Sequence, residues 1–342
     1  MVMRKIFQLY ILFILFLCFT ISCKRNHYKV DISGIEANIE IRRLEKDLFT
    51  VNPDDIPAEV PSLRKKYKGF LQLFSYVINT GDVNDSIFND FLVRFCTDRQ
   101  NNEVYSATMK FYPDLTEIEE KLSNAFRYYL YYFPGKIIPD VYTCISGFNN
   151  SIITGDSVLG IGLDRYLGAD CEYYQRLGIY KYISDRMTPS NIVPDCIYGW
   201  ASSEWDLSAI GYQADNVLTE MIHYGKLKYY ERCMLPVKPD ELIFGFTANQ
   251  MEFCRNNEDQ MWQYLLEHDF LFSTDQFIIR KLIGEAPFTS YFTNESPGMA
   301  AVWIGFHIVE SYMINNSVVK LDELMRDADI QEILEKARYS PK

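Results

Sequence analysis

In the middle of this chain the hydrophobic pattern changes from helical spacing to a period of two, and that change limits the folds the chain can adopt. Three short apolar segments, 141–145, 151–154 and 158–163, are separated by turn-forming residues between 147 and 156. Short segments with a period of two and intervening turns predict a small antiparallel meander. Across most of the remaining chain the apolar residues recur at helical spacing. The pattern predicts an α+β fold that is mostly helical, with a small antiparallel sheet.

The predicted elements follow one another without a linker rich in glycine or serine, which favours a single domain over residues 30–342. A strand is predicted over 30–44, followed by a loop punctuated by Pro53, Pro57 and Pro61. The segment from Pro113 to Glu117 resembles a capping box that opens a helical run to Phe133, and Ser296 with Pro297 resembles a helix start. Helices are predicted over 63–79, 86–97, 102–111, 114–133, 194–205, 215–235, 247–269, 275–284, 297–315 and 321–337.

The N-terminus has the layout of a secretory signal. Arg4 and Lys5 precede an apolar run from Leu9 to Phe19, which is shorter than the ~20 residues that a spanning helix needs. Ser22 and Cys23 then resemble the lipobox of bacterial lipoproteins. We therefore expect residues 1–22 to be removed, Cys23 to be acylated, and residues 23–29 to form the lipid anchor and a polar tether. The alternative is an ordinary signal peptide followed by an incidental cysteine.

Charge and cysteine spacing exclude several classes of function. The formal net charge of -12 disfavours a nucleic-acid partner. Six cysteines beyond Cys23 are scattered without a C-x-x-C pair, which excludes a zinc knuckle and a thioredoxin motif. The segment from Gly160 to Arg165 begins like a dinucleotide loop but has arginine where the third glycine should stand. There is also no phosphate-binding P-loop and no G-x-S-x-G motif.

One segment resembles a catalytic metal motif. Thr219-Glu220-Met221-Ile222-His223 matches H-E-x-x-H at Glu220 and His223 but has threonine in place of the first histidine. Threonine is a poor zinc ligand, so we expect no bound zinc or other cofactor, and the motif is weak support for an enzyme. Two interpretations stay open: an incidental pair on a helix edge, and a degenerate zincin-like metallopeptidase scaffold. A working zinc peptidase using Glu220 and His223 is the alternative function.

A second candidate site consists of carboxylates that are far apart in the sequence. Asp164, Glu204, Asp206 and Glu295 lie near predicted element ends and could converge on a cleft. With aromatic neighbours, such a cleft would serve a periplasmic binding lipoprotein. This is a third hypothesis for the function.

Several segments together resemble the GldB-type gliding-motility lipoproteins of Bacteroidetes, in family order along almost the whole mature chain. They are 44–49 (LEKDLF), 111–115 (FYPDL), 131–134 (YYFP), 145–149 (ISGFN), 160–168 (GIGLDRYLG), 192–195 (IVPD), 221–226 (MIHYGK), 260–262 (QMW), 271–275 (LFSTD), 286–290 (APFTS) and 295–298 (ESPG). The resemblance contributes no catalytic residue. It implies a periplasm-facing, lipid-anchored component or assembly factor of an envelope machine for gliding and associated protein secretion, with envelope proteins as partners. Lys24, in place of an aspartate after Cys23, favours the outer over the inner membrane.

Replacing the predicted lipid acceptor tests the anchor. Cys23→Ala removes the only thiol that the lipobox offers for acylation, so we expect the variant to lose labelled palmitate and to leave the membrane fraction. A single acyl chain binds a bilayer only marginally, whereas several chains hold a protein stably. Metabolic labelling followed by membrane fractionation measures both properties. Palmitate uptake and membrane association that persist in Cys23→Ala would show that this assignment is wrong.

Overall fold

Four short strands form a mixed sheet, β1-β2-β4-β3, in the part of the chain that the structure describes. The structure is a computed structural model that describes residues 26–341, and residues 31–341 form one compact unit. The strands are β1 (Ile41–Arg43), β2 (Asp140–Cys144), β3 (Ile152–Gly155) and β4 (Val158–Gly162). The predicted α+β class, mostly helical with a small sheet, is confirmed. The predicted strand over 30–44 is wrong except for its last few residues.

The prediction that this sheet is antiparallel holds for only one of its three strand pairs. β3 and β4 form an antiparallel hairpin, whereas β1 pairs with β2, and β2 with β4, in parallel. Parallel neighbours need a long connection. In the sequence, helices connect β1 to β2, and β3 lies between β2 and β4 although it is not placed between them in the sheet. The short period-two segments therefore indicated the strands correctly but not the direction in which they pair.

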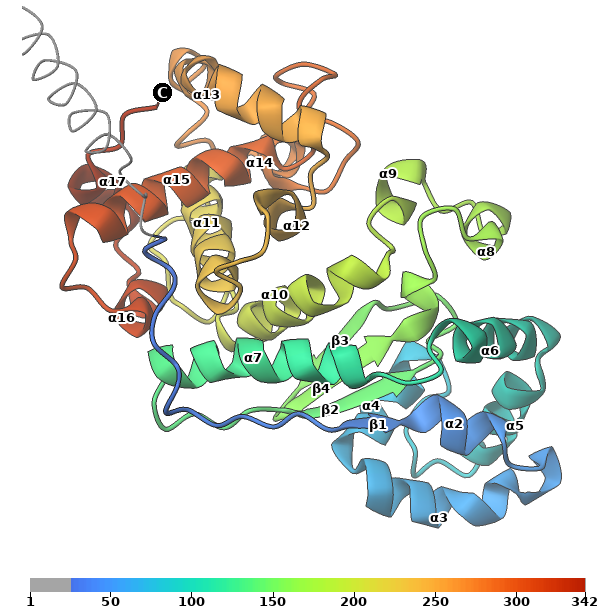
Figure 1. The fold of residues 1–342 in the computed structure, drawn as a ribbon. Coiled ribbons are helices and arrows are strands. Elements are labelled where there is room, and N and C mark those ends of the chain that lie inside the picture. Colours follow the sequence, from blue (N-terminus) through green and yellow to red (C-terminus); the bar gives the residue numbers. More distant parts are fainter. Residues whose placement is uncertain (1–25, 342) are drawn as a thin grey trace, which may run out of the picture. The chain divides into compact units, whose positions relative to one another are not determined.

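Both faces of the sheet are covered, which explains why β4 is buried along its whole length. Gly160 faces Phe70 of helix α4 (Gly69–Val77), and a Cβ on Gly160 would lie 2.4 Å from the Phe70 ring. On the opposite face, Ile152 packs against Gly199 of helix α10 (Ile192–Glu204). In Figure 1, α10 and α7 (Thr116–Tyr132) run along the same side of the sheet.

The helices of the first half surround this sheet, and those of the second half form a larger helical layer. Besides α4, α7 and α10 they are α2 (Leu44–Phe49), α3 (Ile56–Tyr67), α5 (Phe88–Thr97), α6 (Arg99–Phe111), α8 (Glu172–Arg176), α9 (Lys181–Ser184), α11 (Val217–Met234), α12 (Asp240–Phe244), α13 (Ala248–Glu267), α14 (Gln276–Ile283), α15 (Ala300–Asn315), α16 (Leu321–Arg326) and α17 (Ile330–Ala337). Short 3-10 turns occupy Pro53–Asp55, Leu163–Tyr166 and Pro189–Asn191. Sequence spacing did not predict the short helices α2, α8, α9 and α12.

The predicted helix over 63–79 is two helices, and the first begins inside the predicted proline loop. Lys68 has a positive φ of 47° and separates α3 from α4. Pro57 lies in the first turn of α3, where its missing N–H costs nothing, while Pro61 is inside the helix. α3 buries Ile56 and Val60 on one face, so tertiary packing outweighs the proline at position 61.

Three predicted helix boundaries are also wrong. α15 begins at Ala300 rather than after Ser296, because the Ser296 hydroxyl donates to the Thr293 carbonyl oxygen at 2.6 Å and Met299 adopts a left-handed conformation. The Ala300 N–H donates instead to the Thr289 hydroxyl. At α7, Leu115 is the N-cap and no capping box forms. The predicted helix over 321–337 is interrupted between α16 and α17.

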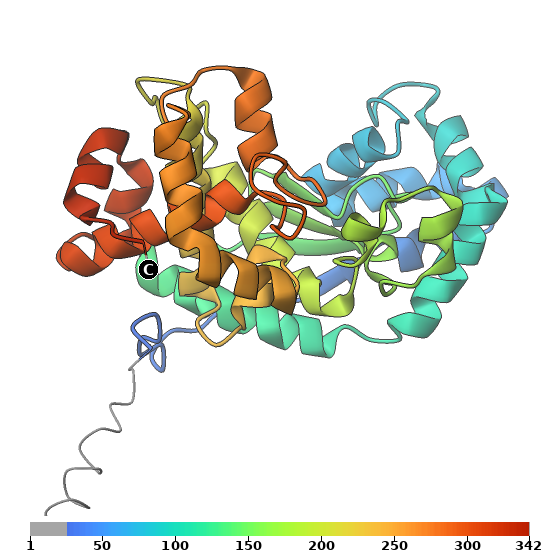
Figure 2. The same ribbon diagram turned by 90° about the horizontal axis from the view of Figure 1, so that it is seen from above.

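The most extensive helix pair is α11 against α15, at two facing glycines. A Cβ on Gly305 would lie 1.9 Å from the Met221 carbonyl oxygen, and one on Gly225 would lie 2.4 Å from the Gly305 carbonyl carbon. The two backbones are therefore closer than any side chain permits. α11 also contacts α10, α14 and α7, and it is buried on almost all sides (Figures 1 and 2).

No helix within residues 26–341 combines the length and apolar character that crossing a bilayer requires. Six cysteines in this part of the chain are free thiols, and five of them are buried. The predicted signal peptide and Cys23 lie outside the described residues, so their assignment stays a prediction.

Adding one methyl group at the glycine contact tests the close packing of α11 and α15. Gly305→Ala forces the two helices apart, and we expect the free energy of unfolding to fall by about 3 kcal/mol, near the upper end of typical overpacking costs. Gly69→Ala is the matched control, because nothing lies within 4 Å of a Cβ at this position. Urea unfolding measures both variants. Equal midpoints for the two would contradict the close contact.

Candidate functional site

A pocket of about 870 Å³ lies where α10, α11, α12 and α14 meet the beginning of β3. The segment between α9 and α10 and the loops on both sides of residue 290 complete its wall. A volume of this size falls within the range of small-molecule and cofactor sites. Its lining includes four tyrosines, 166, 182, 198 and 224, and charged groups of both signs. Such a wall suits a ligand that has both polar and apolar parts.

The pocket face of α11 is set by helical spacing. Glu220, Tyr224 and Lys228 follow one another at intervals of four, so they lie on one side of the helix and all line the pocket. On α10, Tyr198 and Gly199 line it in the same way. The small Gly199 matters at this point, since a Cβ would lie 2.8 Å from the Ile152 side chain. Side chains of α10 and α11 thus form part of the polar lining of the pocket.

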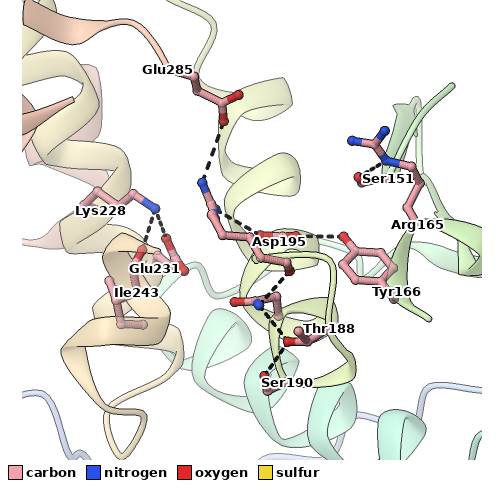
Figure 3. A network of polar contacts seen from close by, with 12 residues as sticks. Ser151, Arg165, Tyr166, Thr188, Ser190, Asp195, Lys228, Glu231, Ile243 and Glu285 are labelled. Carbon is pink, nitrogen blue, oxygen red and sulfur yellow. Dashed lines mark hydrogen bonds and ion pairs between the residues drawn. The ribbon is translucent and has the colours of Figure 1, made fainter. Parts of the chain in front are cut away.

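Lys228 is a buried cation whose charge is already engaged. Its Nζ donates to Glu231 Oε2 at 2.9 Å and to the Ile243 carbonyl oxygen at 2.5 Å (Figure 3). It also lies 4.1 Å from the centroid of the Tyr198 ring. Burial raises the pKa of Glu231 to about 7, and the neighbouring Lys228 opposes that rise. The ammonium group therefore joins α11 to α12 and is held in place on the pocket wall.

Asp195 forms the centre of a second polar group in the pocket. The Tyr166 hydroxyl donates to Asp195 Oδ2 at 2.8 Å, and Arg186 Nη2 lies 3.5 Å from Asp195 Oδ1 (Figure 3). Arg186 also faces Glu285 at 3.7 Å, which places the guanidinium between two carboxylates. Burial raises the pKa of Asp195, and Arg186 is the main group that opposes the rise. Asp195 and Arg186 were not singled out in the sequence, where each is an isolated polar residue in a helical or loop segment.

The three key positions of the degenerate H-E-x-x-H segment face different surroundings. Glu220 lines the pocket, but Thr219 donates from its N–H and its hydroxyl to Asn216 Oδ1 at the start of α11. His223 is 2 % exposed, does not line the pocket, and its Nδ1 is 3.1 Å from the Tyr212 hydroxyl. Within residues 26–341 no group of three or more His, Cys, Asp or Glu side chains is arranged to hold a metal ion.

Glu220 and His223 differ in protonation as well as in position. Burial, followed by the nearby Asp215, raises the pKa of Glu220 to about 7. Burial, followed by the charge on Lys226, lowers the pKa of His223 to about 4. The contribution of His223 to stability is therefore present above pH 6.5 and is lost as the pH falls toward 4. Glu220 acts in the opposite sense, since its neutral form is favoured in the folded protein.

The four carboxylates predicted to converge on a cleft do not meet at the pocket, which none of them lines. Asp164 is fully buried and accepts hydrogen bonds from the N–H groups of Ser146 and Phe148, at 2.9 and 2.6 Å. Glu204 accepts from the Tyr129 hydroxyl at 2.8 Å. Asp206 and Glu295 lie in exposed loops. Asp164 thus fixes the turn after β2. The expected cleft near Asp164 and Glu204 is wrong, because the pocket is lined by neither residue.

Stability as a function of pH tests the environment of Glu220. The folded protein holds a proton on this carboxyl between its ordinary pKa of 4.5 and about 7, so the wild type loses stability as the pH rises through this window. Glu220→Gln keeps the group neutral. We expect its urea midpoint, relative to the wild type, to be higher at pH 8 than at pH 5.

Asp215→Asn supplies the control for this measurement. It removes the second cause of the raised pKa of Glu220, so the pH dependence of the Glu220→Gln effect should become smaller in its background. The same difference between Glu220→Gln and the wild type at both pH values would contradict the assignment.

A comparison with protein-family models identifies the chain. The model of gliding motility protein GldB matches residues 25–341, which is nearly the whole chain. No curated protein and no solved structure matches significantly. The match confirms the resemblance that the sequence segments indicated. The chain therefore belongs to the GldB family of gliding motility proteins.

Proposed function

We propose that this chain is a lipid-anchored, non-enzymatic component or assembly factor of the envelope machinery for gliding motility and associated protein secretion. The observation that carries the proposal is the family match over residues 25–341. The partners are other envelope proteins of this machinery. We assign the pocket between α10, α11, α12 and α14 as the place where such a partner is held.

The proposed anchor is supported by the sequence. Arg4, Lys5 and the apolar run up to Phe19 lead to Ser22 and Cys23 in the order of a lipoprotein signal. An acylated Cys23 would anchor the domain to a membrane so that it faces the periplasm. We propose that this is the outer membrane rather than the inner membrane. A net charge of -12 suits contacts with basic surfaces of partner proteins rather than with nucleic acid.

The state of the pocket side chains supports binding over catalysis. Lys228 is engaged by Glu231 and the Ile243 carbonyl oxygen, and Asp195 accepts from Tyr166. A general base must lie within hydrogen-bond reach of the proton that it abstracts from a bound substrate. The imidazole of His223 is instead hydrogen-bonded to Tyr212, away from the pocket. The pocket groups are fixed in position and suited to recognising a shape.

One observation favours a second function, that of an envelope hydrolase. The pKa of Glu220, at about 7, lies in the range that serves a general base at neutral pH, and Glu220 lines the pocket. A zinc-dependent peptidase would also require His223 as a metal ligand, with Glu220 as the general base. Loss of activity on removal of Glu220 would distinguish this function from the first.

Complementation of a deletion strain decides between the two. If the chain acts by binding, the double variant Glu220→Gln, His223→Gln restores surface spreading and secretion of exported proteins to near wild-type levels, because neither residue performs chemistry. Wild-type and empty-vector strains give the limits, and immunoblotting confirms equal amounts of protein. A folded double variant that behaves like the empty vector would favour the hydrolase.

Metal analysis of the purified protein gives an independent readout. We expect the purified protein to contain much less than one zinc ion per chain, and we expect His223→Gln to have the same zinc content as the wild type. Stoichiometric zinc that is lost in this variant would overturn the non-enzymatic proposal even if spreading were restored.

A further inference from the structure

The outer edge of β3 offers main-chain hydrogen-bonding groups that no described segment uses. β3 is the last strand of the sheet and pairs only with β4. The Gly162 N–H donates to the Ser151 carbonyl oxygen at 2.9 Å, so Ser151 and Gly162 form a hydrogen-bonded pair. Because such pairs alternate along an antiparallel ladder, the N–H and C=O groups of Ile152 and Thr154 point away from β4. Within residues 26–341 they have no hydrogen-bond partner.

The opposite edge of the same sheet is closed. Side chains of α7 reach the N–H groups at and just before β1: Glu119 Oε1 accepts from Ile41 at 2.8 Å, and Ser123 Oγ accepts from Ile39 at 2.9 Å. Proteins commonly protect edge strands in this way, since a free edge is a template for another strand. The sheet thus has one protected edge and one open edge.

The open edge leads into the pocket. Ser151 and Ile152, at the beginning of β3, line the pocket together with Arg165. Arg165 is held over this end of the strand, because its Nε donates to Ser151 Oγ at 3.1 Å (Figure 3) and its Nη1 donates to the Phe148 carbonyl oxygen at 3.0 Å. Its Nη2 makes no hydrogen bond within the described residues. A half-buried guanidinium whose Nη2 is free favours a carboxylate as its partner.

We propose that β3 and the pocket bind an extended peptide segment of a partner protein, which adds to the sheet as a fifth strand. The main chain of the peptide pairs with Ile152 and Thr154, and an acidic side chain or a C-terminal carboxylate of the peptide contacts Arg165. The rest of the segment enters the pocket between α10 and α11. This inference rests on the proposed function and names the chemistry of its partner.

Main-chain pairing singles out a peptide among the ligands that such a pocket could hold. Strand addition at a sheet edge draws its affinity from backbone hydrogen bonds and its specificity from pockets for alternate side chains. Lipids and nucleotides lack the alternating N–H and C=O groups that Ile152 and Thr154 require. The mixed charges and tyrosines of the pocket suit a side chain of a peptide rather than a polyanion.

Proline at the outward-facing position of β3 provides a selective test. Thr154→Pro removes an N–H that points away from β4, so the ladder with β4 stays intact. Thr154→Val is the matched control, since it keeps the N–H and changes only the side chain. The probe is a set of 12-residue peptides selected from a random displayed library on the purified lipidated protein in detergent. Their affinities are measured by fluorescence anisotropy.

We expect the selected peptides to carry a carboxylate and to bind Thr154→Pro about tenfold more weakly than the wild type, a change that corresponds to roughly one to two hydrogen bonds. Thr154→Val should bind within about twofold of the wild type. Peptides with the carboxylate changed to an amide should also bind more weakly. Bound peptide should slow hydrogen exchange at the amides of Ile152 and Thr154.

Two results overturn the proposal: equal affinity of the peptides for Thr154→Pro and the wild type, and the absence of any enriched peptide. If Thr154→Pro does not fold, N-methylation of the peptide at alternate residues removes the same hydrogen bonds from the other side. If the selected peptides bind normally but the wild-type gene is not needed for spreading or secretion, the peptide site stands and only the proposed function is contradicted. Lost binding by Thr154→Pro with normal spreading would separate the peptide site from gliding.

Discussion

The contact of Gly225 with Gly305 is the constraint on which the second half of the structure depends. Without side chains at these positions, α11 and α15 approach until backbone meets backbone. That approach fixes the rotation of α11 about its own axis, because Met221 and Gly225 must face α15. Glu220 and Tyr224, which directly precede Met221 and Gly225 in the sequence, then face the pocket. The set of α11 side chains that line the pocket therefore depends on the absence of side chains at Gly225 and Gly305.

The same rotation explains the fate of the degenerate metal motif. In H-E-x-x-H the first and last positions share one face of a helix. In this chain that face turns Thr219 toward the N-cap residue and His223 toward Tyr212, while Glu220 alone reaches the pocket. Spacing correctly indicated which residues share a face of the helix. It carried no information about what that face would meet, because that depends on a partner helix far along the chain.

Local signals predicted the elements of this fold better than their pairing. The long helices α7, α11, α13 and α15 and the three later strands lie where the periodicity indicated. The parallel pairing of β1 with β2 depends on contacts between residues about a hundred positions apart, which no local pattern encodes. The pocket was missed for the same reason. Asp195, Arg186 and Lys228 are ordinary polar residues in the sequence and become a group only when four helices meet the sheet.

The order in which the chain is made gives the glycine contact another consequence. The apolar cluster between α2 and β4 is complete once residue 158 has been made, so the N-terminal part can close early. α11 is buried on almost all sides, yet its main partner is not available until Gly305 has been made. Until α15 has been synthesised, the apolar surface that α11 buries against it in the folded protein therefore stays uncovered. The second half of the chain depends on late partners, and this interval is when it is most exposed to aggregation and most in need of a chaperone.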